Sequence, residues 1–244
     1  MRKVLASVGI GNATVDTVLP GTTVTPGESV DAEVRVEGGE AEQEVDRIEL
    51  ELETRFRTED GYAEGTVDRL VLSEGLTVEP GTSETLDATV EIPWHTPVTL
   101  GDARVWVETE LEIPLAVDPE DRDSLDVQPT PRMRTLFDAA ESLGLSFRTA
   151  DCEADPYGRY GGHRFVQEFE FRPSGGPFAG DLDEVEFVAA PGPDALEVYV
   201  EVDRRAGLLS EMAETDESRT SLTVTSTDPD AVAEALRTAL ERHA

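Results

Sequence analysis

The sequence is short of cysteine, lysine and histidine. Cys152 is the single cysteine, which excludes an intrachain disulfide and a CxxC metal site. Lys3 is the only lysine, so every other basic residue is an arginine. The three histidines, at positions 95, 163 and 243, are scattered, and no HExxH motif or histidine-carboxylate cluster favours a transition-metal site. We therefore expect no metal and no cofactor.

Long apolar runs are also missing. No stretch approaches the roughly 18 residues that cross a bilayer. The first residues are basic and then apolar, but glycines break this stretch early, unlike a secretion signal. We expect a cytoplasmic protein without an integral membrane segment.

Negative charge is abundant instead. The 53 Asp and Glu residues against 20 Lys and Arg give a formal net charge of -33. Such a chain repels phosphates, so nucleic acid is excluded as an ordinary partner. Molar salt shortens the Debye length to about 3 Å and screens the self-repulsion. The composition therefore predicts a halophilic protein, whereas a merely disordered acidic chain is disfavoured by the strand patterns below.

The first half, residues 1–122, has the pattern of an antiparallel β-sandwich. Apolar residues alternate with charged ones in four stretches, which is the period of a strand with one buried face. Glycine- and proline-containing turns separate the stretches, and no helical pattern intervenes. The apolar sets are Val30 to Val36, Ile48 to Phe56, Leu86 to Ile92 and Ala103 to Ile113, with Trp106 on the charged face of the last.

The second half, residues 123–244, predicts a second β-rich domain with two helices. The polar segment Pro119 to Pro131 has the composition of a domain boundary. Thr130-Pro131 and Asp228-Pro229 are typical helix starts, and apolar residues at helical spacing follow both, which predicts helices near 131–143 and 229–243. Strand patterns occupy the region between them, and Glu211 to Thr220 is expected to form a mobile acidic loop.

Searches for catalytic chemistry end without a signature. Cys152 and His163 are the best candidates for a thiol site, but a lone cysteine is more often a small buried hydrophobe. Two acidic runs, Asp118 to Asp123 and Asp181 to Glu186, contain the carboxylates that Ca²⁺ prefers but lack the glycine and final glutamate of an EF-hand. A solvated acidic linker and a solvated strand face are the favoured interpretations.

Several segments, taken in order, resemble the sporulation-control protein family of arrestin-like regulators. They are Val4 to Gly11 with Val15 to Thr17, Val24 to Glu28, Glu37 to Gln43, Ile92 to Gly101 with Val105 to Val107, Ala116 to Glu120, Phe165 to Phe171, Gly176 to Phe178, and Glu197 to Arg205. The resemblance implies an arrestin-like β-sandwich joined to a second domain, in a non-enzymatic regulator or scaffold that binds a protein partner.

Two sets of residues are candidate contacts under this hypothesis. Aromatic and arginine side chains dominate binding hot spots, which favours Tyr157, Arg159, Tyr160 and His163 as a partner-binding loop, although they could simply plug the end of the domain. By analogy with arrestin-like proteins, an interdomain role is predicted for Asp118, Asp121, Asp203, Arg204 and Arg205. The alternatives are an enzyme that uses Cys152 and His163, or a small-ligand binder.

Overall fold

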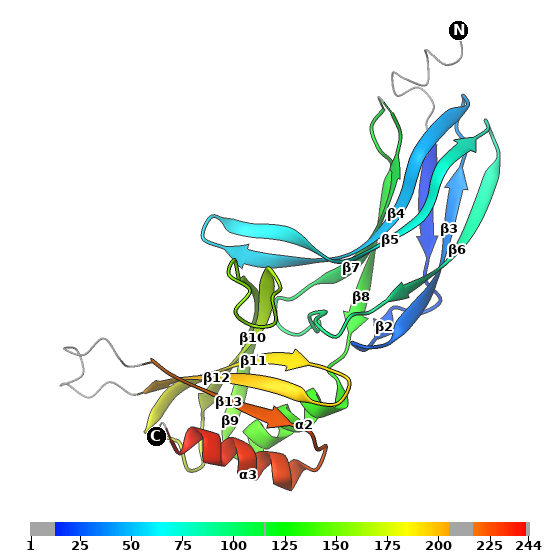
Figure 1. The fold of residues 1–244 in the computed structure, drawn as a ribbon. Coiled ribbons are helices and arrows are strands. Elements are labelled where there is room, and N and C mark those ends of the chain that lie inside the picture. The colour runs from blue at the N-terminus through cyan, green and yellow to red at the C-terminus, as the bar shows by residue number, and fades with distance from the viewer. Residues whose placement is uncertain (1–12, 115, 205–216, 243–244) are drawn as a thin grey trace. The chain divides into compact units, whose positions relative to one another are not determined.

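The chain folds into two compact units. The structure is a computed structural model and describes residues 13–114, 116–204 and 217–242 (Figure 1). The first unit comprises Met1–Thr54, Glu64–Thr96 and Arg104–Val127; the second comprises Arg55–Ala63, Pro97–Ala103 and Gln128–Ala244. The sequence placed the division at 122/123, whereas residues 123–127 group with the first unit and two short stretches of the first half group with the second.

The first unit contains two β-sheets. One has the order β1 (Thr14–Val18), β3 (Ser29–Glu37) and β6 (Ser83–Glu91). The other contains β2 (Thr23–Val24), β8 (Glu120–Val127), β7 (Val105–Glu112), β4 (Gln43–Thr58) and β5 (Gly61–Val78). The Thr17 and Thr109 hydroxyl groups, from β1 and β7, lie 2.7 Å apart and link the two sheets in the core.

The four alternating patterns of the first half are confirmed as β3, β4, β6 and β7. Val34, Ile48 and Leu111 from three of these strands are fully buried, as the alternation predicted. Trp106 is a correction, because it is only 7% exposed although it alternates with charged residues. Its indole nitrogen donates to the Glu108 carboxylate at 3.0 Å, and the guanidinium of Arg122 lies over its ring. The arginine and the glutamate therefore cover the indole on this face.

The predicted acidic linker is wrong over Glu120–Val127, which forms strand β8. This strand pairs with β7 in antiparallel and with β2 in parallel orientation, so the sheet is not wholly antiparallel. Leu125 and Val127 are buried, and the Asp121 carboxylate accepts a 2.7 Å hydrogen bond from the backbone N–H of Thr17. The acidic residues concealed the strand because their partners lie about a hundred residues away in sequence.

The second unit is a sheet with helices on one face. The chain order is α2 (Pro131–Ser142), β9 (Leu145–Ala154), β10 (Phe165–Pro173), β11 (Leu182–Pro191), β12 (Leu196–Arg204), β13 (Glu217–Val224) and α3 (Pro229–Leu240). The strands lie in sequence order and pair antiparallel. Figure 1 shows α2 and α3 along the same face of this sheet. Phe137 of α2 packs on Phe169 of β10, with ring centroids 5.0 Å apart.

Both predicted helices are confirmed, together with their start signals. The Thr130 side chain accepts from the backbone N–H of Met133 at 3.3 Å, and the Asp228 side chain accepts from that of Asp230 at 3.1 Å. In each helix proline occupies the first turn, where no N–H is required. Gly144, with φ at 84°, follows the last turn of α2. The mainly β fold with two helices in the described second half is thus confirmed.

The predicted mobile loop at 211–220 is wrong over its last residues. Glu217 to Thr220 belong to β13 and pair with β12, with Thr220 opposite Val200. Residues 211–216 lie outside the described residues.

Within the described ranges, no helix has the length and apolar character needed to cross a membrane.

A short segment, Pro97–Ala103, is tied closely to β9 and β10 of the second unit. The side-chain amide of Gln167 makes two hydrogen bonds to the backbone of Val98: Oε1 accepts from N at 2.8 Å, and Nε2 donates to O at 2.7 Å. Gly101 has φ at +60°, and a Cβ atom there would lie 2.6 Å from Ala150 N and 2.5 Å from Ala150 O. Only glycine permits this close approach of two backbones.

We predict that Gly101→Ala destabilises the second unit by about 3 kcal/mol or more, because left-handed strain adds to a backbone clash. Gly75→Ala is the matched control, since Gly75 also has positive φ (+71°) but nothing within 4 Å of the added Cβ. This control should lose only about 1 kcal/mol. Urea unfolding followed by circular dichroism measures both, and equal losses would contradict the prediction.

Candidate functional site

The loop between β9 and β10 is held by one buried carboxylate. Asp155 is 1% exposed in its side chain. Its Oδ2 accepts from the backbone N–H of Tyr160 at 3.1 Å, and its Oδ1 faces Nε of Arg159 at 3.5 Å. The Asp155 backbone N–H donates to the carbonyl of Arg164 at 2.7 Å, which closes the base of the loop. The loop is therefore anchored from within.

The four predicted partner-contact residues lie on this loop but face different surroundings. Tyr157 is 86% exposed, the largest exposure of any described aromatic side chain. Tyr160 turns to the sheet and packs edge-on against Tyr199 of β12, with ring centroids 5.0 Å apart. The Arg159 guanidinium lies 5.7 Å from the centre of the Tyr160 ring, and His163 is half-buried. Only Tyr157 is presented wholly to solvent.

The sheet face opposite α2 and α3 carries a row of charged side chains. Because directly paired residues point to the same side, Glu170, Glu186, Glu201 and Arg219 stand next to one another across β10 to β13. Glu170 pairs with Arg148 at 2.9 Å, and Glu201 with Arg219 at 2.8 Å. Among the described residues, no arginine forms an ion pair with Glu186 or with its diagonal neighbour Glu168.

A pocket of about 60 Å³ opens on this face. Its walls are aromatic and aliphatic, from Tyr160, Tyr199 and Val188, and its carboxylates come from Glu168, Glu186 and Glu201. The remaining lining residues are Val200, Arg219 and Thr220. The pocket thus joins the anchored loop to the charged row of the sheet.

Burial and like charge act together on the two unpaired carboxylates. Partial burial, the largest cause, and the like charges of Glu168, Glu184, Glu201 and Asp203 together raise the pKa of Glu186 to about 7. Burial likewise raises the pKa of Glu168, with Glu153 and Glu201 acting in the same direction and Arg57 and Arg159 opposing. The expectation of a solvated strand face at Glu186 is therefore wrong, because the loop and its neighbours half bury it.

Cys152 is placed as a packing residue. It lies on β9 opposite Gln167 and is 3% exposed. A reactive cysteine requires an accessible thiolate, and this side chain is enclosed on the helix side of the sheet. The geometry gives no support to the thiol-enzyme alternative.

The residues predicted to act between domains have local roles where the structure describes them. Asp118 Oδ1 accepts from the backbone N–H of Ile113 at 2.8 Å, and Asp121 binds the backbone of Thr17. Asp203 lies on β12 opposite Glu217. Arg205 and the side chain of Arg204 lie outside the described residues, so the interdomain pairing stays a prediction.

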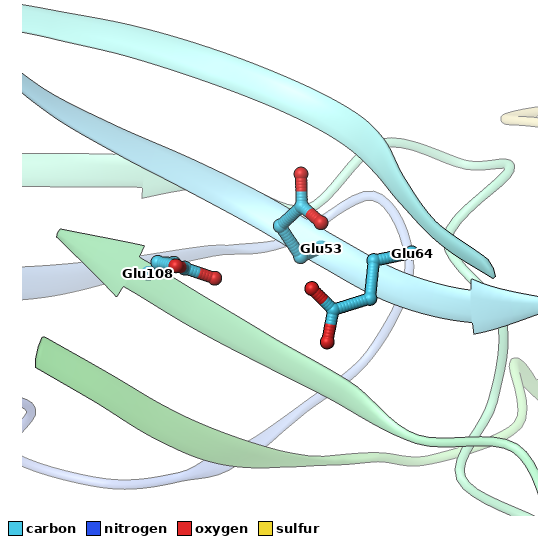
Figure 2. Close-up of side chains that lie close together, drawn as sticks. All are labelled: Glu53, Glu64 and Glu108. Carbon is cyan, nitrogen blue, oxygen red and sulfur yellow. The ribbon is translucent and has the colours of Figure 1, made fainter. Parts of the chain in front are cut away.

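Three carboxylates of the first unit lie close together (Figure 2). Glu53 of β4, Glu64 of β5 and Glu108 of β7 each bring one oxygen within 4.8 Å of the others. Such an arrangement has the donor atoms that a hard cation prefers. Burial raises the pKa of Glu53, and nearby Glu51, Glu108 and Glu64 add to this effect against a hydrogen bond from Thr66.

Protein donors already bind all three of these carboxylates. The two terminal nitrogens of Arg122 contact Glu64 at 2.9 Å and Glu108 at 2.8 Å. The Thr66 hydroxyl donates to Glu53 at 2.7 Å. Each carboxylate therefore has a partner. The group is a network of ion pairs and hydrogen bonds that links side chains of β4, β5, β7 and β8.

Sequence reasoning found the loop but missed the pocket. Tyr199, Glu168 and Glu201 were not candidate residues, because their meeting depends on the register of four strands. The one available signal was the run of glutamates at alternate positions in the strands around Glu168, Glu186 and Glu201. That signal predicts a charged face of the sheet, but it does not predict which carboxylate forms an ion pair with an arginine and which does not.

We predict that Glu186→Gln stabilises the protein at pH 8. The folded protein holds the Glu186 proton up to about pH 7, and the unfolded chain releases it near 4.5, so wild-type stability falls as pH rises between these values. The variant avoids that loss and gains about 1 kcal/mol at pH 8 after allowance for solvent screening, with no gain at pH 4. Glu184→Gln is the control, because Glu184 pairs with Arg172 at 3.1 Å. Urea unfolding at both pH values measures the difference, and an equal gain at pH 4 and 8 would refute it.

Thiol labelling checks the placement of Cys152. Because the side chain is 3% exposed, a chromogenic disulfide reagent should label it in the folded protein at least about a hundredfold more slowly than in urea. Comparable rates in the two states would show that the thiol is accessible.

Known proteins resemble this chain over nearly its whole length. The family model described as SpoOM protein matches residues 1–206. The sporulation-control protein spo0M of Bacillus subtilis (strain 168) is 38% identical over 221 residues, covering 86% of this chain and 84% of that protein. The crystal structure of Spo0M from Bacillus subtilis superposes with a TM-score of 0.85 at 33% identity, covering 96% of this chain and 100% of that one. The chain therefore belongs to the Spo0M family of sporulation-control proteins.

Proposed function

We propose that this protein is a non-enzymatic regulator that acts by binding another protein, and that the Asp155–Arg164 loop is a contact surface. Membership of a sporulation-control family supports a regulatory role. The observation that carries the binding role is Tyr157, whose large ring is 86% exposed on a loop fixed from below by a buried carboxylate.

The physical basis is the low cost of ordering this loop. Tyrosine offers a large amphipathic contact area with few rotatable bonds, and tyrosine and arginine are enriched among hot-spot residues. The Asp155 bonds to Tyr160 and Arg159 hold the loop before any partner arrives. A partner that covers Tyr157 therefore gains apolar burial with little loss of conformational entropy.

The arrestin-like sandwich of the first unit is the second part of the proposal. A sheet edge can receive a partner strand, and β6, at one edge of the sheet that has the order β1, β3 and β6, has the alternating pattern that suits such an addition. A thiol enzyme is not proposed, because Cys152 is buried. The high net charge still predicts activity in a salt-rich compartment, so the assays belong in molar KCl.

We predict that Tyr157→Ala weakens retention of a protein partner at least about tenfold while leaving the fold intact. The full chain serves as bait for native lysate in molar KCl, with wild type, Tyr157→Ala and Tyr62→Ala compared quantitatively. Tyr62 is the matched control, since it is a 55% exposed tyrosine on the β4–β5 hairpin.

The expected result is one stoichiometric protein retained by wild type and by the Tyr62 variant but lost with the Tyr157 variant. Equal retention by all three baits would remove the loop from the contact. Circular dichroism melting of each bait separates loss of contact from loss of folding.

A further inference from the structure

Among the described residues that line the pocket beside Tyr160, carboxylates outnumber arginines. In the row across β10 to β13, Glu170 is paired with Arg148 and Glu201 with Arg219, while Glu186 stands between them unpaired among the described residues. Like charges placed directly opposite on neighbouring strands repel each other, so this position is electrostatically unfavourable as it stands. A positive group at the pocket would remove the repulsion.

The charged groups around the pocket confirm the imbalance. Glu168, Glu186 and Glu201 line the pocket, and the charges of Glu184 and Asp203 also act on Glu186. The described cations nearby include Arg219 of β13, Arg159 of the loop and Arg57 of β4. Arg219 makes two hydrogen bonds to Glu201, at 2.8 and 3.1 Å. Arg159 pairs with Asp155, and Arg57 pairs with Glu153 at 2.5 Å. Each of these arginines already holds another carboxylate.

We propose that the Tyr160–Tyr199 pocket receives the guanidinium group of an arginine side chain from a protein partner. This inference rests on the proposed function and adds the chemistry by which the partner is recognised. Glu186 and Glu168 supply the negative charge, and the two tyrosine rings supply aromatic surface. The exposed Tyr157 lies three residues from Tyr160, so one partner surface can cover both.

The size of the pocket favours a side-chain head group over a small-molecule ligand. About 60 Å³ is several times what one water molecule needs, but it is far below the volume of a ligand-binding cleft. The combination of aromatic and acidic side chains in the pocket walls also favours a guanidinium group. A guanidinium is planar and weakly hydrated, so it stacks on aromatic rings while it donates to carboxylates. A small metal ion would leave the tyrosine and valine walls without a role.

Binding of arginine can be tested on the full chain with a small probe. N-acetyl-arginine amide carries the side chain without backbone charges, and N-acetyl-citrulline amide has nearly the same shape without the positive charge. Carbon-13 tyrosine labelling reports on Tyr62, Tyr157, Tyr160 and Tyr199, the four tyrosines of the chain. We expect saturable shifts of the Tyr160 and Tyr199 signals with the arginine probe alone, while Tyr62 does not move.

Two variants make the test specific. Glu186→Gln should weaken the arginine probe about tenfold, because the unpaired carboxylate is removed. At pH 8, Glu184→Gln should weaken the probe much less than Glu186→Gln does, since Glu184 lies on the same strand but outside the pocket lining and pairs with Arg172. Affinity for the wild type should also rise between pH 6 and pH 8, as the cation favours the ionised Glu186.

Equal shifts with the citrulline probe, or no shift of Tyr160 and Tyr199, would overturn this inference. If the Tyr157 variant loses its partner while the arginine probe fails to bind, partner binding through the loop stands and the arginine pocket does not. If the probe binds but no bait retains a protein, the pocket stands and the proposed loop contact fails.

Discussion

A shortage of cations governs this structure. The chain has 53 acidic residues and 20 basic ones, and several of the described arginines contact two carboxylates each. Arg122 contacts Glu64 and Glu108, and Arg47 contacts Glu49 and Glu112. These shared guanidinium groups allow neighbouring strands to carry glutamates at paired positions, which would otherwise repel one another. At Glu186, with which no described arginine forms an ion pair, the repulsion remains and burial strengthens it.

Local signals predicted the helices well, and the strand alternation predicted much of the sheet structure. A helix start needs only its own few residues, and Thr130 and Asp228 make the capping bonds that the sequence indicated. Alternation likewise identified β3 and β4, since each strand's burial depends on its own pattern. The fold class followed from these local features, and the family followed from the ordered segments that resemble it.

Contacts between distant residues could not be predicted in the same way. Strand β8 resembled a linker, because Thr17, the partner of Asp121, lies 104 residues away. The alternation predicted that Trp106 faces solvent, but Arg122 of another strand covers its ring. The pocket depends on the register of β10 to β13, which no single segment specifies. The loop residues were predicted from their aromatic and arginine side chains. That Tyr157 faces solvent while Tyr160 packs on the sheet could not be predicted, because it depends on the hydrogen bond from Tyr160 to the buried Asp155.

The segment Pro97–Ala103 has a consequence for how this protein can evolve and be dissected. It leaves the first unit, inserts Gly101 against Ala150 of the second, and returns to the first as Arg104. Residues Arg55–Ala63 make a similar excursion. Neither unit is a continuous stretch of chain: a cut after Val127 keeps every stretch of the first unit together but separates Arg55–Ala63 and Pro97–Ala103 from the rest of the second. An exchange of residues 128–244 alone would leave these two stretches of the second unit behind, so we expect recombination within this family to keep the two units together.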